Sequence, residues 1–166
     1  PKSMGTLSGS RLDKNNTINI TFEAAEAVIP FPQNVKADPV NIFVDQSTTV
    51  SWDACAGASS YNIYVNDVKQ ASTPATSYVL SNLQYNLDPG EKINVTAVVG
   101  GEESEMSNDV FVKVAAYFPL EINVVDAQGN PMQDVVIVLD GHNEFGNVIN
   151  QTYTSDANGN VTVEKM

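Results

Sequence analysis

Few side chains in this sequence have the types and spacing that catalysis or metal binding requires. The chain contains one histidine, His142, and one cysteine, Cys55. A Ser-His-Asp triad would have to be built around His142, yet the sequence has no G-x-S-x-G turn to expose a nucleophilic serine. One His and one Cys cannot fill a zinc site without several carboxylates. We therefore expect no enzyme, no metal site and no cofactor, with His142 in a loop and Cys55 as a small buried apolar residue.

The stretch "DANGN" at 156–160 has some features of a calcium-binding loop. A helix-loop-helix calcium site needs glycine at its sixth position and a bidentate glutamate at its twelfth. Val161 stands at the sixth position. The related stretch "DAQGN" occurs at 126–130, and in both frames Asp can accept backbone hydrogen bonds while Gly supplies a positive φ. Two tight turns are predicted. Spacing does not identify glycosidase carboxylate pairs, but the short loops leave no room for a deep cleft, so we expect none.

The elements that would position these residues are strands. Apolar and polar residues alternate with a period of two in several short segments separated by turn-forming residues, which is typical of antiparallel sandwiches. These segments are 17–22, 48–52, 61–65, 93–99, 109–115, 120–125, 135–139 and 160–164. The best helical candidate, 22–28, is soon stopped by Pro30 and Pro32. We predict an all-β fold of two tandem immunoglobulin-like β-sandwiches with an N-terminal extended arm, divided as 1–32, 33–115 and 118–166.

Residues 33–115 resemble a fibronectin type III domain along nearly their whole length. "PQNVKAD" resembles its opening strand, "TTVSWDACAGASSYNIYVN" its B and C strands, and "LDPGEKINVTAVVGGEESEMSNDVFV" its L-x-P-G turn, V-x-A strand and closing segment. The resemblance implies a structural core that includes Trp52, Tyr61, Tyr64, Leu87 and Val95. Trp52 can bury roughly 200 Å² between two sheets, so we expect it in the core and not as a sugar platform.

Two departures limit what this resemblance implies. The family usually has a tyrosine six residues after the Leu of its L-x-P-G turn, and Ile93 stands there instead. The hydroxyl that would pin this corner is therefore missing, and we expect some loss of rigidity. No R-G-D tripeptide occurs, so integrin binding is not implied.

Residues 118–166 resemble the carboxypeptidase-regulatory type of immunoglobulin-like domain. The resemblance rests on V-x-D-x-x-G-x-P, a following V-x-V strand and a T-x-D-x-x-G turn. Such sandwiches usually have roughly 75–100 residues, so we expect this one to be incomplete. Either residues beyond Met166 complete it, which we favour, or a neighbouring subunit lends strands. A hinge is expected near Tyr117–Pro119. No Lys lies in 120–125, so the Lys–Asn crosslink of related adhesin domains is not expected.

Residues 1–32 belong to neither sandwich. Their segment "TINITF" is amphipathic, with Ile18, Ile20 and Phe22 on one face. An isolated strand is not stable in water and must add to an existing sheet edge. It either caps the fibronectin-like domain of its own chain or serves as an assembly arm that docks on another subunit.

Charge and hydropathy exclude two classes of partner. The net charge is −12, and residues 33–116 and 117–166 each carry six more acidic than basic residues, whereas residues 1–32 are neutral. A strongly negative body repels phosphate backbones, so nucleic-acid binding is not expected; the charge also favours solubility. No run approaches the roughly 18 apolar residues of a membrane span, so membrane insertion is not expected.

Tandem sandwiches of these two families imply spacers or binding modules, in phage virions or at bacterial surfaces. The opening "PKSMGTLSGS" lacks the apolar run of an export signal. If it is the native start, it favours a virion protein released by lysis. If it is a processed or cloned end, it favours a bacterial surface protein.

We expect a capsid-decoration, tail or fibre protein on the virion surface that projects its sandwiches outward. Its expected partners are other structural subunits, bound through the arm, and host-surface glycans or proteins, bound through the sandwiches. The alternative is a spacer or adhesion module at the bacterial cell surface or in an extracellular protein, including an accessory module of a carbohydrate-active enzyme.

Overall fold

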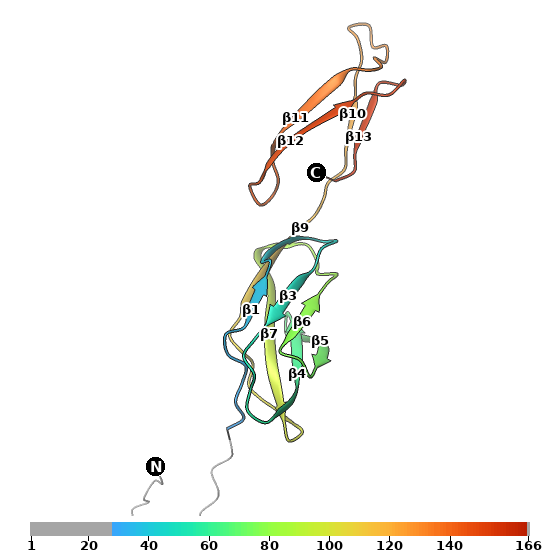
Figure 1. Ribbon diagram of the computed structural model, residues 1–166. Coiled ribbons are helices and arrows are strands. Elements are labelled where there is room, and N and C mark those ends of the chain that lie inside the picture. Colours follow the sequence, from blue (N-terminus) through green and yellow to red (C-terminus); the bar gives the residue numbers. More distant parts are fainter. Residues whose placement is uncertain (1–27, 166) are drawn as a thin grey trace, which may run out of the picture.

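The computed structural model describes residues 28–165, and every regular element in that range is a strand (Figure 1). The predicted all-β fold class is thereby confirmed. The strands are β1 (Lys36–Asp38), β2 (Asn41–Phe43), β3 (Thr48–Ser51), β4 (Ala58–Val65), β5 (Val68–Thr73), β6 (Ser77–Leu80), β7 (Asn86–Val99), β8 (Glu102–Glu103), β9 (Val110–Ala115), β10 (Leu120–Asn123), β11 (Val136–His142), β12 (Val148–Thr154) and β13 (Asn160–Val163). The expected arm strand with Ile18, Ile20 and Phe22 lies outside the described residues. Within the described range, no helix is long and apolar enough to cross a membrane.

The first sandwich consists of two sheets that share one core. One sheet has the order β2-β9-β7-β4-β5, with β8 added to β7, and the other has the order β1-β3-β6. Neighbouring strands are antiparallel except β2 and β9, which run parallel. Side chains of both sheets meet in one apolar cluster: Val35, Ala37, Ile42, Val50, Trp52, Tyr61, Ile63, Val65, Leu80, Leu83, Ile93, Val95, Ala97, Val112 and Val114.

Strand alternation decides which of the expected core residues are buried. Trp52, Tyr61 and Val95 are buried, and the Trp52 and Tyr61 rings meet edge to face with 5.3 Å between centroids. Tyr64 is only half-buried and lies outside the core cluster. Its neighbours on β4 point inward, and successive residues of a strand point to opposite faces. The placement of Tyr64 in the core is thus corrected.

Leu87 also lies outside the core cluster and is half-buried. Leu83, four residues earlier, is buried at 7 % exposure in the cluster. The β7–β9 register shifts between Asn86 and Glu91, so the strand is irregular where Leu87 stands. Alternation therefore does not set the direction of this side chain, and Leu83 belongs to the core cluster whereas Leu87 does not.

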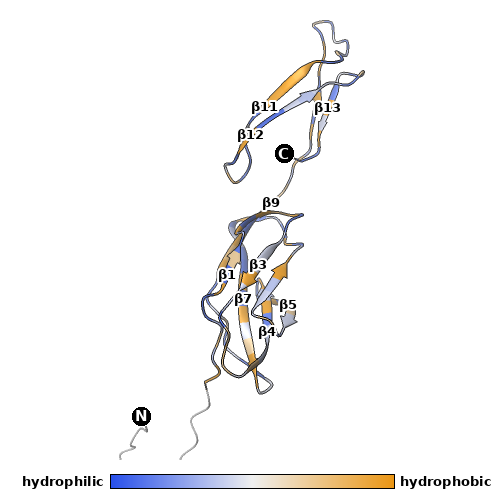
Figure 2. Cartoon of the chain, viewed as in Figure 1, coloured by the Kyte–Doolittle hydropathy of each residue, from blue (hydrophilic) through white to orange (hydrophobic). Residues whose placement is uncertain are grey.

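The second sandwich is built from two small sheets, β10–β13 and β11–β12. Val161 and Val163 of β13 are buried, at 5 % and 3 % exposure. Figure 2 shows apolar colouring along β11. Gly159 is required for close approach, because a Cβ there would lie 2.4 Å from the carbonyl oxygen of Val124. The turn before β13 is therefore in backbone-to-backbone contact with the segment that follows β10 in the same sheet.

Three turns of the second sandwich share one hydrogen-bond pattern. Oδ1 of Asp126 and of Asp156 accepts from the backbone N–H groups two and four residues later, at 2.8–2.9 Å. This is the geometry expected for the two "DA-x-GN" frames. Asn143 makes the same two bonds at 3.0 Å in "NEFGN". Asn can therefore replace Asp at the first position of this turn. The sequence pattern was defined by Asp, so it did not identify the third turn, at 143–147.

Candidate site at the junction of the two sandwiches

Residues 116–119 connect β9 to β10, and side chains from both sandwiches gather around this connection. The ring of Phe43, at the end of β2, stacks on Tyr117 with 4.3 Å between centroids and 9° between planes. Phe145, from the β11–β12 loop, meets the Phe43 ring edge to face at 5.3 Å and 74°. Each such pair contributes about 0.5–1.5 kcal/mol beyond its buried area. Phe43 thereby contacts the connection and the second sandwich at once.

A charged pair crosses the same junction. Lys165, after β13, donates to Oδ2 of Asp45 in the first sandwich, and its Nζ lies 4.9 Å from the Tyr117 ring centroid. The hydrogen bond from Lys165 holds the pKa of Asp45 below its usual value, and Asp45 raises the pKa of Lys165. Burial, followed by the negative charge of Asp45, raises the pKa of Tyr117. The pair links the two sandwiches, but because both side chains are solvent-exposed its contribution to stability is small.

Glu144 makes the third link across the junction. Its Oε1 accepts from the hydroxyl of Tyr85 at 3.2 Å, and its Oε2 accepts from the backbone N–H of Ala116 at 3.3 Å. The hydrogen bond to Glu144 raises the pKa of Tyr85. A carboxylate of the second sandwich therefore binds both the first sandwich and the connection.

These contacts brace the connection near Tyr117–Pro119, the place of the expected hinge. Bending at Tyr117–Pro119 would have to separate the Phe43–Tyr117 stack, the Lys165–Asp45 pair and the Glu144 bonds together. The arrangement can set the angle between the two sandwiches. Among residues 28–165, no group of three or more His, Cys, Asp or Glu side chains is placed to hold a metal ion.

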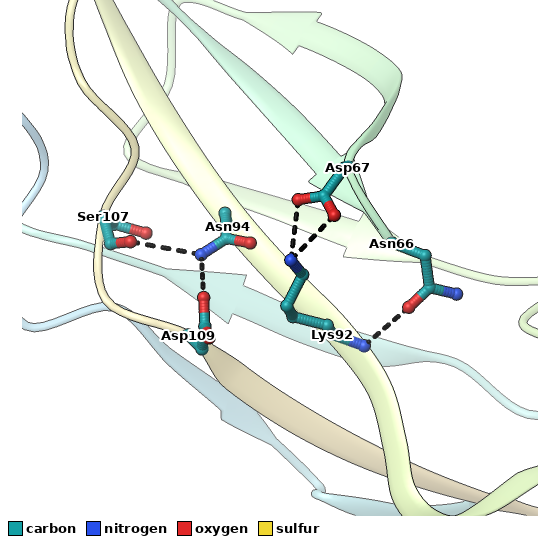
Figure 3. Close-up of polar contacts among 6 residues, drawn as sticks. All are labelled: Asn66, Asp67, Lys92, Asn94, Ser107 and Asp109. Carbon is teal, nitrogen blue, oxygen red and sulfur yellow. Dashed lines mark hydrogen bonds and ion pairs between the residues drawn. The ribbon is translucent and has the colours of Figure 1, made fainter.

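The first sandwich is itself stiffened by polar bonds along β7 (Figure 3). Asn66 donates its N–H to the Lys92 carbonyl at 2.8 Å and accepts the Lys92 N–H on Oδ1 at 3.0 Å. Nζ of Lys92 contacts both carboxylate oxygens of Asp67, at 2.7 and 2.8 Å, and Asp67 raises its pKa. Farther along β7, Nδ2 of Asn94 donates to Oδ1 of Asp109 at 2.7 Å. These bonds hold the turn after β4 and the segment before β9 onto β7, on either side of the buried Ile93.

Glu103 accepts a second group of hydrogen bonds, on the outer face of the same sheet. Its Oε1 accepts from Nδ2 of Asn62 at 2.8 Å, from the hydroxyl of Tyr64 at 2.6 Å, and from Oγ1 of Thr96. Burial opposes ionisation of Glu103, but these hydrogen bonds outweigh it and lower its pKa. The same carboxylate raises the pKa of Tyr64. Tyr64 thus holds the β7–β8 turn onto β4.

Cys55 and His142, the side chains most capable of nucleophilic or acid-base chemistry, take no part in these hydrogen-bonded groups; His142 lies beside the junction, in a pocket with Phe118, Pro119 and Glu144. Cys55 is half-buried, and desolvation followed by the charge of Asp53 raises the pKa of its thiol, which disfavours the nucleophilic thiolate. The backbone N–H of Cys55 donates to the Tyr61 hydroxyl at 2.8 Å. His142 is the exposed last residue of β11, not a loop residue as expected, because the ladder extends to the pair His142–Val148.

Comparison with known proteins gives one relative of interest. No family model matches the chain. A tail tube protein of Bacillus phage SPP1 is 38% identical over 92 residues, which are 54% of this chain and 34% of that protein. The match therefore spans about a third of the length of that relative.

Solved structures similar to the chain include fibronectin type III-like domains. A Fn3-like protein from Clostridium thermocellum is 21% identical, with a TM-score of 0.42, over 53% of this chain and 95% of that one. The fibronectin(III)-like modules of CbhA, also from Clostridium thermocellum, are 15% identical, with a TM-score of 0.36, over 80% of this chain and 79% of that one.

Proposed function

We propose that this chain is a non-enzymatic structural part of a phage tail, in which two braced β-sandwiches project outward from the tail surface. The observation that carries the proposal is the 38% identity over 92 residues to a phage tail tube protein. The junction around Tyr117 supports a mechanical role, since its contacts serve to orient two sandwiches and include no reacting group.

The attachment point is residues 1–32. In Figure 1 the first described residues enter the first sandwich at the end opposite to the connection 116–119. Residues 1–32 are neutral, whereas the rest of the chain carries the whole net charge of −12. Attachment through the neutral arm leaves the acidic sandwiches in solvent, where like charge limits crowding of neighbouring copies.

The outward-facing sandwiches act as a spacer, and their outer surfaces are available to host-surface glycans or proteins. A fixed angle is useful in such a spacer, because every copy then presents its second sandwich in the same direction. The bonds of Glu103 and Lys92 on the first sandwich serve the same end by stiffening the sheet that supports the junction.

Fractionation of the natural source tests this proposal. Particles released by lysis would be banded on a density gradient, and peptides from residues 33–165 quantified by mass spectrometry in each fraction. We expect these peptides to follow the tail proteins at a constant ratio. Recovery in the cell-wall fraction or the culture fluid, without tail proteins, would instead identify a bacterial surface or secreted spacer and overturn the proposal.

A further inference from the structure

We infer that the outer edge of β12 is a self-association site, at which two copies of the chain pair β12 against β12 in antiparallel fashion about a twofold axis. The β11–β12 hairpins of the two copies would then form one four-stranded sheet, which joins the second sandwich of one copy to that of the other. This contact is separate from the arm at residues 1–32 and from the junction around Tyr117.

The first observation is that no other strand among residues 28–165 covers this edge. β11 and β12 form a two-stranded sheet with seven cross-strand pairs, from Val136–Thr154 to His142–Val148, and no shift in register. None of the other described strands pairs with either of them. An open edge presents a row of unpaired N–H and C=O groups that can template another strand.

The second observation is the contrast with β5, the longest edge strand of the first sandwich. β5 carries Lys69, is followed at once by Pro74, and pairs with β4 through a register shift between Ile63 and Tyr64. Lysine, proline and bulges are the devices that block edge-to-edge pairing. β12 has the sequence "VINQTYT", with neither lysine nor proline, and an unbroken register. The first sandwich therefore protects its longest edge strand, β5, whereas the second sandwich leaves the seven-residue edge of β12 unprotected.

The third observation identifies a second copy as the occupant, because β12 is complementary to itself. With the twofold axis at Gln151, Ile149 lies opposite Tyr153 of the partner copy, and Asn150 opposite Thr152 of the partner copy. Aromatic and β-branched side chains make favourable cross-strand pairs, and β12 contains no charge to repel its own copy. The edge of β11 is less suitable, since a twofold axis at its centre would place Asp140 against an apolar valine.

The pairing is weak between free chains, but it becomes strong enough to join copies that are held side by side. One pair of seven-residue strands buries much less than the roughly 1,200 Å² of a stable interface. Residues 117–166 also carry an excess of acidic side chains, whose repulsion is screened beyond about 8–10 Å at physiological salt. Copies held side by side reach effective concentrations of about 1 mM, so weak pairing is amplified there.

Sedimentation velocity of the full 166-residue chain, from about 10 μM to about 1 mM, tests the inference. Gln151 is exposed at the proposed axis, so Gln151→Lys and Gln151→Glu each place like charges opposite one another. We expect reversible dimers of the wild type, and dimerisation about fivefold weaker for each variant alone. An equimolar mixture of the two variants restores it, because Lys then faces Glu.

Gln70→Lys is the matched control, because it makes the same substitution on the exposed edge strand β5 and should leave dimerisation unchanged. Circular dichroism melting of each variant verifies that folding is intact. A wild type that stays monomeric throughout would overturn the inference. So would folded Gln151 variants that dimerise as strongly as the wild type, since association would then use another surface.

Discussion

The rings of Phe43 and Tyr117 lie face to face, 4.3 Å apart and within 9° of parallel, although 116–119 lies outside every strand. Phe43 ends β2, which pairs in parallel with the end of β9 through Phe43–Ala115, and the N–H of Val44 donates to the Ala115 carbonyl at 3.0 Å. The stacked rings therefore continue the contact between these two chain segments beyond their last strand pair. The first half of the connection therefore belongs structurally to the first sandwich.

Replacing this ring should loosen the junction. We expect Phe43→Ala to remove contacts with both Tyr117 and Phe145, each worth about 0.5–1.5 kcal/mol, and so to broaden the range of angles between the sandwiches. Small-angle X-ray scattering and residual dipolar couplings measure this range. Phe111→Ala removes an exposed ring from β9 and is the control. Equal angular distributions for Phe43→Ala and the wild type would contradict a braced junction.

Stability should depend on pH through Glu103. Its folded pKa lies below the usual value, so its contribution is fully present above the unfolded pKa of about 4.3 and is lost as the pH falls through the folded pKa. Glu103→Gln keeps an acceptor oxygen but does not titrate, and we expect a smaller loss of unfolding free energy on acidification. Urea unfolding at about pH 7, 5 and 3 measures the difference.

Glu102 provides the comparison, because it is the other residue of β8 and accepts none of these side-chain bonds from Asn62, Tyr64 and Thr96. Glu102→Gln should keep the pH dependence of the wild type. If Glu103→Gln kept it as well, the hydrogen bonds to Glu103 would have no role in acid sensitivity.

Gly90 should tolerate no side chain. Its φ is +108°, and a Cβ would lie 2.8 Å from the carbonyl oxygen of Val112 on β9. We expect Gly90→Ala to lower the free energy of unfolding by about 2 kcal/mol or more, from backbone strain and displacement of β9. Gly141→Ala, where nothing lies within 4 Å of the new Cβ, should change it by less than about 0.5 kcal/mol. Equal effects of the two substitutions in denaturant titrations would refute this explanation.

Tyr61 should stabilise the loop after Trp52 through its hydroxyl. Tyr61→Phe keeps the ring contact with Trp52 but leaves the Cys55 N–H without its acceptor, at a cost of about 1–2 kcal/mol. Hydrogen exchange should accelerate at the Cys55 amide. The Trp52 amide, which donates to the Thr76 carbonyl, should exchange as before and serves as the internal control. Unchanged exchange at Cys55 would show that the loop is held by other contacts.

The features that were predictable from the sequence are local ones. Alternation correctly indicated strands along β4 and β7, and the two "DA-x-GN" frames form the expected turns. Tyr64 was misplaced because the resemblance identified an aromatic strand without deciding which side chains point inward. Adjacent residues of a strand occupy opposite faces, so an error of one position exchanges core and surface.

The junction could not be predicted, because its contacts join residues far apart in the chain. Lys165 and Asp45 are separated by 120 positions, and Tyr85 and Glu144 by 59. No local pattern marks such pairs, and exposed Lys, Asp and Glu are ordinary surface residues. Glu103 was missed for the same reason, since its partner Tyr64 lies 39 positions away. Pairing of this kind becomes visible only when the strands are placed in register.

Electron cryomicroscopy of intact tails from the natural source tests the central proposal most directly. An antibody fragment raised against residues 28–165 would mark the position of the chain. The account predicts sandwich-shaped density on the outer surface, repeated along the tail, with the fragment bound to its outermost part. Bare tails, with the same fragment bound to the surface of uninfected cells, would contradict it.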